Sequence, residues 1–365
     1  MIGSCSPLDK YFRSNRVVIS DRFTYHRAHP DVTYEEYREN QRRVICDSIS
    51  SKRVIYLDTN AWKCLSDYER EKPKLSNSMI DFAQTINSDL VRRKCVFPIG
   101  LATLFELQSM DDPVSLSTLT DLVNRFSMGI GCQPPNEVID QELALFKADR
   151  DTCVGPERFC HPVEIFGRLQ ANVPNLLPEP ETLAFNKAML DLLHALPIAT
   201  ILEMAAANKH FRWDNNEGIA EMNDGMLAHQ HEIKTYPDAL LIELTGIMRS
   251  HVADGPAIQN LPPAKAYALM ALIHWHDNPQ STHLMTARVL AHLHASVRYL
   301  QNRKFHQGDI ADFATAQVSL SSAHAFFTDK ALANLLNEPK IALRQFCSCE
   351  VVSGFDNFAA YLKDV

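Results

Sequence analysis

The sequence predicts an α/β fold in which helices flank a parallel sheet and a large α-helical insertion interrupts the chain. Short apolar strands at 53–58 and 95–99 each lead into a helical pattern, an order typical of parallel strands. Helical patterns alone then fill about 129–285, after which strands return at 325–328 and 349–353. Because the strand pattern resumes, we expect one interrupted fold and not two separate domains.

Local signals along the chain predict the individual elements. Thr33 and Glu36 have the spacing of a capping box, so a helix should begin there. The other expected helices are one directly after Asp58, 78–92, one carrying Glu106, 181–194, 199–209, 237–249, 286–302 and 309–321. The chain should divide into an N-terminal polar arm with a helix (1–51), the first half of the core (52–128), the helical insertion (129–285) and the second half of the core (286–365).

The composition is that of a globular protein. Of 365 residues, 46% are apolar and 22% charged, which excludes a disordered or low-complexity polymer. The net charge of −8 disfavours broad nonspecific binding to polyanions, although acidic metal ligands would contribute to that total. The sequence has no secretory signal and no apolar run long enough for a membrane span, and its nine cysteines should be reduced. We therefore expect a cytoplasmic protein with no membrane partner.

Acidic residues stand where predicted strands end or helices begin. They are Asp58 after the first strand, Glu106 in the helix after the second, Asp309 and Asp312 at the start of one helix, and Asp329 after the strand 325–328. Carboxylates in such places can converge at the carboxyl edge of a parallel sheet. Several carboxylates cannot remain ionised together without a cation, so Mg²⁺ or Mn²⁺ is the expected cofactor. The pattern indicates a metal-dependent phosphodiesterase, with a ribonuclease favoured.

These pieces, taken in order, resemble the PIN-domain nuclease superfamily. The matching segments are 56–60, Glu106, Asp309 and Asp312 ahead of 314–316, 326–329, and a last strand and helix at 349–358. The resemblance covers roughly 52–128 and 286–365 and implies a Rossmannoid parallel sheet with an acidic metal site. That family usually has one aspartate at the start of the third acidic helix, whereas this chain has two on one helical face, so the choice between them stays open. The resemblance also suggests a homodimer.

The expected chemistry assigns a role to each residue type. Divalent ions can activate the water, neutralise the phosphate and help the leaving alkoxide. The expected catalytic residues are Asp58, Glu106, Asp309, Asp312 and Asp329, all but Glu106 as metal ligands. Glu106 would bind metal or orient the attacking water as a base. The residues expected to hydrogen-bond the ligands or the substrate phosphate are Thr59, Asn60 and Thr328. Alternatively, each acid could simply cap a helix, occupy a turn or face solvent.

Basic residues ahead of the last acidic helix are the candidates for substrate binding. They are Arg298, Arg303 and Lys304, with His306 beside them and 92–94 as a second basic group. Such side chains can contact phosphates without reading sequence, although ordinary solvated charge is the alternative. Histidine pairs at 229/231, 274/276 and 292/294 have i,i+2 spacing, which puts the two rings on different helix faces and disfavours zinc catalysis.

Three functions remain open from the sequence. The first is an endoribonuclease, of a toxin, defence or processing type, with RNA favoured over DNA. The second is a single-stranded or flap-like DNA nuclease, because the same acids could cleave either backbone. The third is an inactive PIN-like scaffold, in which the helical insertion would bind a regulatory protein partner. An active site requires the carboxylates to lie within shared reach of a metal ion, whereas a scaffold does not.

Overall fold

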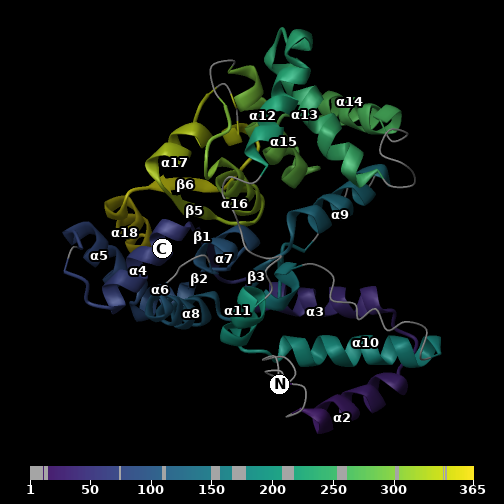
Figure 1. Cartoon of the computed structure of the whole chain (residues 1–365), viewed down its shortest axis with the longest axis vertical. Helices are drawn as coiled ribbons and strands as arrows, with labels where there is room; N and C mark the ends of the chain where they lie inside the picture. The colour runs from purple at the N-terminus through teal and green to yellow at the C-terminus, as the bar shows by residue number, and fades with distance from the viewer. Residues whose placement is uncertain are drawn as a thin grey trace, which may run out of the picture.

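The computed structural model shows a mostly helical α/β protein built on a small parallel sheet (Figure 1). The described residues are 11, 15–73, 75–108, 112–148, 157–166, 178–207, 218–252, 261–300, 304–339, 341 and 343–365. None of the helices in these ranges has both the length and the apolar run that crossing a bilayer requires.

Four parallel strands form the sheet in the order β2-β1-β5-β6. They are β1 (Arg53–Leu57), β2 (Cys95–Val96), β5 (Ala325–Thr328) and β6 (Glu350–Ser353). β1 is central, since it pairs with β2 on one side and with β5 on the other. The predicted parallel α/β sheet is therefore confirmed, although β2 is shorter than the expected strand 95–99.

The residues of β1 after Arg53 and all residues of β5 are buried because helices cover both faces of the sheet, whereas Glu350 in β6 is exposed. Successive side chains point to opposite faces. On one face, Leu57 and Phe327 belong to the same apolar cluster as Trp62 and Phe82. The helices on that side are α4 (Thr59–Glu69), α5 (Asn77–Ile86), α8 (Pro113–Ser127) and α18 (Phe355–Lys363).

Tyr56 and Phe326 pack on the other face of the sheet, in a second cluster with Val289 and Phe313. The helices that contribute to this cluster are α15 (Met285–Tyr299), α16 (Asp309–Ser322) and α17 (Lys330–Leu336). α15 and α16 confirm the helices expected at 286–302 and 309–321. α7 (Leu101–Gln108), which carries Glu106, lies against α16.

The described residues of 129–285 are largely helical but include two short strands that the sequence did not predict. β3 (Gly131–Cys132) pairs antiparallel with β4 (Phe159–Cys160), and a parallel bridge joins Ile99 to Gly131 next to β2. Two-residue strands are too short for an alternating pattern. The helices here are α9 (Pro135–Lys147), α10 (Glu179–His194), α11 (Ile198–Ala207), α12 (Ile219–Ala228), α13 (Tyr236–His251) and α14 (Leu261–Asp277).

Two local predictions have different outcomes. The capping box is confirmed: Thr33 and Glu36 exchange hydrogen bonds at the start of α3 (Tyr34–Ile49). The single helix expected at 78–92 is wrong. The chain forms α5 and then α6 (Asp89–Lys94), because the Ser88 hydroxyl accepts a hydrogen bond from the Val91 amide and starts a new helix.

The N-terminal arm is tied into the fold by buried charges. α2 (Arg16–Arg27) packs beside α10 at one end of the molecule (Figure 1). Arg38 and Arg42, on α3, place their Nε atoms 2.6 and 3.1 Å from Oε2 of Glu164 in the 3-10 helix η1 (Pro162–Phe166). Glu164 has no exposed surface and also bonds His194 on α10. This ion cluster connects segments from three parts of the chain.

Candidate active site

The centre of the sheet is a topological switch point. From β1 the chain proceeds to β2 on one side, whereas β5 leads to β6 on the other. Open parallel sheets bind their ligands at such a point, outside the carboxyl ends of the strands. Asp58 directly follows β1 and Asp329 directly follows β5, so both flank this crevice.

Asp58 is held in a fixed orientation by both of its carboxylate oxygens. One accepts a hydrogen bond from the Thr59 amide at 2.6 Å and the other from the Thr328 hydroxyl at 3.0 Å. Asp58 therefore does cap α4, as the simpler interpretation of this residue expects, while facing the switch point. Burial, together with the charges of Glu106 and Asp329, raises its pKa to about 6, although the bonds from Thr328 and Thr59 act in the opposite direction.

Thr59 links two of the acids. Its amide donates to Asp58, and its hydroxyl donates to a carboxylate oxygen of Glu106 on α7. Glu106 is half-buried, and Asn60, the third residue of the motif, is exposed on α4. The sequence did not predict this specific bridge, because Thr59 and Glu106 lie 47 positions apart. It fixes α7 against the end of β1.

The two aspartates on α16 differ in their surroundings. Asp309 accepts a hydrogen bond from the His306 amide at 2.8 Å, which holds its carboxylate against the preceding turn. Burial raises the pKa of Asp312 to about 7, and the charges of Asp58, Asp329, Glu106 and Asp309 add to this in decreasing order. Asp312 is thus the α16 residue that responds most directly to the other acids.

Asp329 combines two functions at the end of β5. Its carboxylate caps α17 by accepting the Leu332 amide at 2.8 Å. Its charge also raises the pKa of both Asp58 and Asp312. The structure therefore brings together carboxylates from β1, α7, α16 and β5 that are widely separated in sequence.

The donor set suits a hydrated divalent cation. The charged groups that act most strongly on Asp58 and Asp312 are all carboxylates. When these acids are ionised, no basic side chain among those groups neutralises their negative charge, and a bound cation would do so. Within the described ranges, no three His, Cys, Asp or Glu side chains stand close enough to enclose a metal ion. Mg²⁺ needs only one or two carboxylates because it keeps several waters. Asp58 and Asp312 would hold such an ion, with Asp329 beside them.

Metal binding should depend steeply on pH. Asp58 and Asp312 must lose protons to bind a cation, so Mn²⁺ affinity should rise from about pH 5.5 to about pH 7.5. Their raised pKa values also mean that any stability they add to the metal-free protein at low pH is lost as pH rises through 6 to 7. Calorimetric Mn²⁺ titrations at several pH values would measure the effect. Asp312→Asn should abolish the rise in Mn²⁺ affinity near pH 7, whereas Asp309→Asn should retain it. The reverse result would identify Asp309 as the ligand.

The predicted substrate-binding residues differ in where they lie and in their exposure to solvent. Arg298 is buried on α15, where its Nε donates to Glu243 on α13 at 2.5 Å and its guanidinium reaches the Met226 carbonyl at 3.0 Å. It therefore joins helices inside the protein and is no longer a candidate for phosphate binding. Lys304 and His306 are exposed just before α16, while Arg303 lies outside the described residues.

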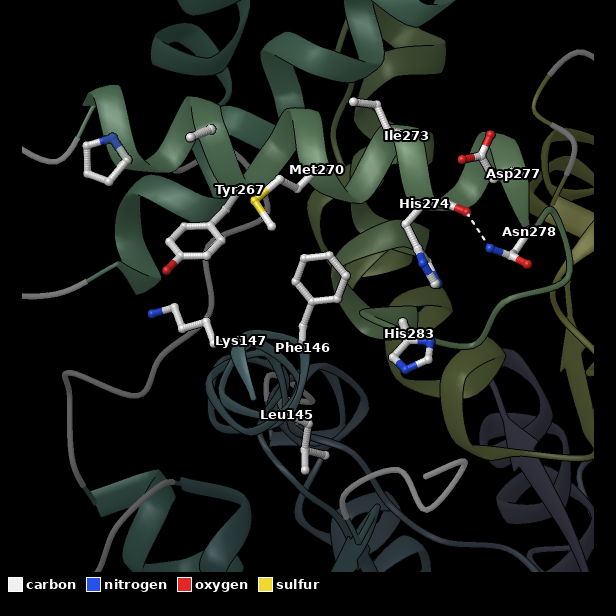
Figure 2. Close-up of a pocket in the computed structure, with 12 residues that line it drawn as sticks. Leu145, Phe146, Lys147, Tyr267, Met270, Ile273, His274, Asp277, Asn278 and His283 are labelled. Atoms are coloured by element: carbon white, nitrogen blue, oxygen red, sulfur yellow. Dashed lines mark hydrogen bonds between the residues drawn. The ribbon is translucent and has the colours of Figure 1, made fainter. Parts of the chain in front are cut away.

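A large pocket among the described residues is separate from the acids. It has a volume of about 880 Å³ and lies between α9 and α14, with Phe146, Tyr267 and Met270 among its lining residues (Figure 2). His274 and His283 stand at its polar side, and His274 bonds the Ser281 hydroxyl at 2.8 Å. None of the predicted site residues that the structure describes lines this pocket.

Comparisons of this chain with protein-family models, curated proteins and solved structures return no match.

Proposed function

We propose that this protein is a PIN-like, divalent-metal-dependent nuclease whose preferred substrate is single-stranded RNA. The observation that carries the proposal is the group of carboxylates at the switch point of a parallel sheet, where Asp312 responds to four other acids. The strand–helix order and the helices on both faces of the sheet support the PIN-like assignment. Free thiols at the seven described cysteines fit a protein of the reducing cytoplasm.

The residues of the chain would divide the work of phosphodiester hydrolysis. A bound Mg²⁺ or Mn²⁺ would neutralise the phosphate and promote ionisation of water. Asp58 and Asp312 would hold the cation, and the bonds from Thr59 and Thr328 keep Asp58 in one orientation. Glu106, fixed by the Thr59 hydroxyl, would orient the attacking water and accept its proton. Lys304, exposed before α16, would contact a substrate phosphate.

Although no three acids among the described residues share reach of one metal ion, the burial of Asp58 and the charge interactions among the acids support an enzyme over a scaffold, with a site of two carboxylates. A scaffold places no demand on its acids, and carboxylates facing separate regions of solvent would support that function. Here Asp58 is 8% exposed and Asp312 is half-buried, and each responds to the charges of the other acids. Buried charges of the same sign repel one another, so this arrangement lowers the stability of the fold. A scaffold that binds its partner through α13 and α14 would gain nothing from that loss.

Cleavage of labelled single-stranded RNA and DNA should test the proposal directly. We expect Mn²⁺ or Mg²⁺ to support cleavage of RNA, EDTA to stop it, and DNA to be cut more slowly. Faster cleavage of DNA would select the DNA-nuclease alternative. A folded protein that binds Mn²⁺ in calorimetry but cuts neither strand would contradict the choice of substrates. If the folded protein neither cleaves RNA or DNA nor binds Mn²⁺, the proposed metal site is wrong.

A further inference from the structure

Basic residues gather at the edge of the sheet opposite to the acids. β1 and β2 are parallel and start together, with Arg53 in register with Cys95. Lys52 precedes β1, and Arg92, Arg93 and Lys94 form the last turn of α6 just before β2. The amino ends of the two strands therefore bring two separate basic segments of the chain side by side.

A pocket of about 330 Å³ lies among these residues. Three arginines line it: Arg92 and Arg93 from α6, and Arg125 from the end of α8. The Arg125 guanidinium lies 4.9 Å above the Phe126 ring and bonds Glu69 at 2.6 Å, which restricts its motion. The pocket is thus a defined hollow with one arginine already positioned, and not merely a stretch of charged surface.

Further cations lie close to this pocket. The Lys52 ammonium donates to the Arg93 carbonyl at 2.6 Å. Cys95 lines the pocket, and although burial raises the pKa of its thiol, the charges of Arg53, Lys52 and Lys94 act to lower it. Six basic residues therefore lie in or next to the hollow.

Negative charge is sparse at the same place. Among the described residues that line the pocket or bond its arginines, the carboxylates are those of Asp89 and Glu69, and the Lys94 ammonium donates to a main-chain oxygen of Val365 at 2.5 Å. The whole chain carries a net charge of −8, so this local excess of cations runs against the overall balance. A basic last turn also complements the carbonyl end of α6, but Lys52, Arg53 and Arg125 come from other elements.

We propose that this arginine pocket binds phosphate groups of an RNA strand, as a second contact outside the cleavage site. Guanidinium groups suit phosphate because their N–H donors form paired, charge-assisted bonds with its oxygens. The identity of the strand rests on the proposed nuclease function, whereas the phosphate chemistry rests on the pocket alone. β1 spans about 17 Å at the usual rise per residue, so only an RNA of several nucleotides could reach both edges of the sheet.

RNA binding in EDTA should test this pocket without cleavage. The probe is a labelled single strand of about 20 nucleotides, long enough for a typical single-strand site. We expect Arg92→Gln/Arg93→Gln to weaken binding by about tenfold or more at low salt. The slope of log affinity against log salt should shrink by about 1.4, since each lost phosphate contact on a single strand contributes about 0.7.

A matched control separates this pocket from general charge loss. Arg22→Gln/Arg27→Gln removes two exposed arginines of α2 and should change affinity and slope far less. Equal effects of the two double variants, at unchanged melting temperatures, would overturn the proposal. Titration with inorganic phosphate and a mononucleotide identifies the source of the phosphate. If either compound binds tightly, and the Arg92/Arg93 variant loses that binding but keeps its RNA affinity, the ligand of the pocket is a small phosphate compound and not RNA. Because binding is measured in EDTA, it requires no cleavage, so RNA binding that depends on Arg92 and Arg93 would stand even if the nuclease proposal failed.

Discussion

Asp58→Asn should lower the rate of RNA cleavage by more than about 100-fold while leaving the melting temperature nearly unchanged or slightly higher. Loss of a residue that only orients a metal ligand costs up to about 100-fold, so loss of a ligand itself should exceed that value. The asparagine oxygen can still cap α4 and accept the Thr59 amide, since Asn and Asp are comparable caps. The substitution also removes a charge from a crowded acidic cluster, which favours folding.

The measurement is single-turnover cleavage with saturating Mn²⁺, alongside thermal unfolding of the same samples. Asp121→Asn is the matched control, because it removes an exposed carboxylate of α8 and should retain full activity. Undiminished cleavage by the Asp58 variant would exclude Asp58 as a metal ligand. Loss of activity together with a lowered melting temperature would instead assign Asp58 to the stability of the fold.

Glu164→Gln should destabilise the protein by about 3–5 kcal/mol, the usual cost of removing one partner from a buried ion pair. Arg38 and Arg42 are 5% and 2% exposed, so without Glu164 two buried guanidinium charges would be offset by Glu137 alone, which both arginines also bond. Burial alone would raise the pKa of Glu164, but His194 and the two arginines lower it to about 2. The ionised glutamate is therefore the form on which the native fold depends.

Urea unfolding at neutral pH would measure this loss of free energy. Glu232→Gln, which removes an exposed carboxylate bonded to His229, should cost far less. Because the pKa of Glu164 is depressed, its contribution is complete above the ordinary glutamate value and is lost as pH falls towards 2. A variant as stable as wild type would show that the arginines find other partners.

The sequence identified the strands that bear the site because they are short, mostly apolar runs followed by an acid. Arg53–Leu57 and Ala325–Thr328 pair side by side, so the two aspartates that follow them lie at the same edge of the sheet. The sequence also predicted the start of α16 at Asp309, which follows a glycine. In the structure, Gly308 has a left-handed φ of 92°, which glycine adopts more easily than other residues. These features depend on local chain chemistry.

Other features depend on contacts that local patterns do not encode. The position of Arg298 before an acidic helix indicated a surface cation, yet its face of α15 is turned inward to Glu243. The distinction between Asp309 and Asp312 arises from the backbone amide of His306 and from the charges of acids on other elements. The break between α5 and α6 depends on Ser88 competing successfully for a capping bond within a pattern that otherwise continues.

The hydrogen bond from Thr328 to Asp58 joins residues 270 positions apart. β1 gains its second neighbour only when β5, which follows it by more than half of the sequence, has been synthesised. While it is being synthesised, the chain therefore contains Asp58 and Glu106 well before Asp312 and Asp329 have been added. If the protein cleaves RNA, it would remain harmless to the messenger and the ribosome that produce it until the chain has been synthesised as far as Asp329.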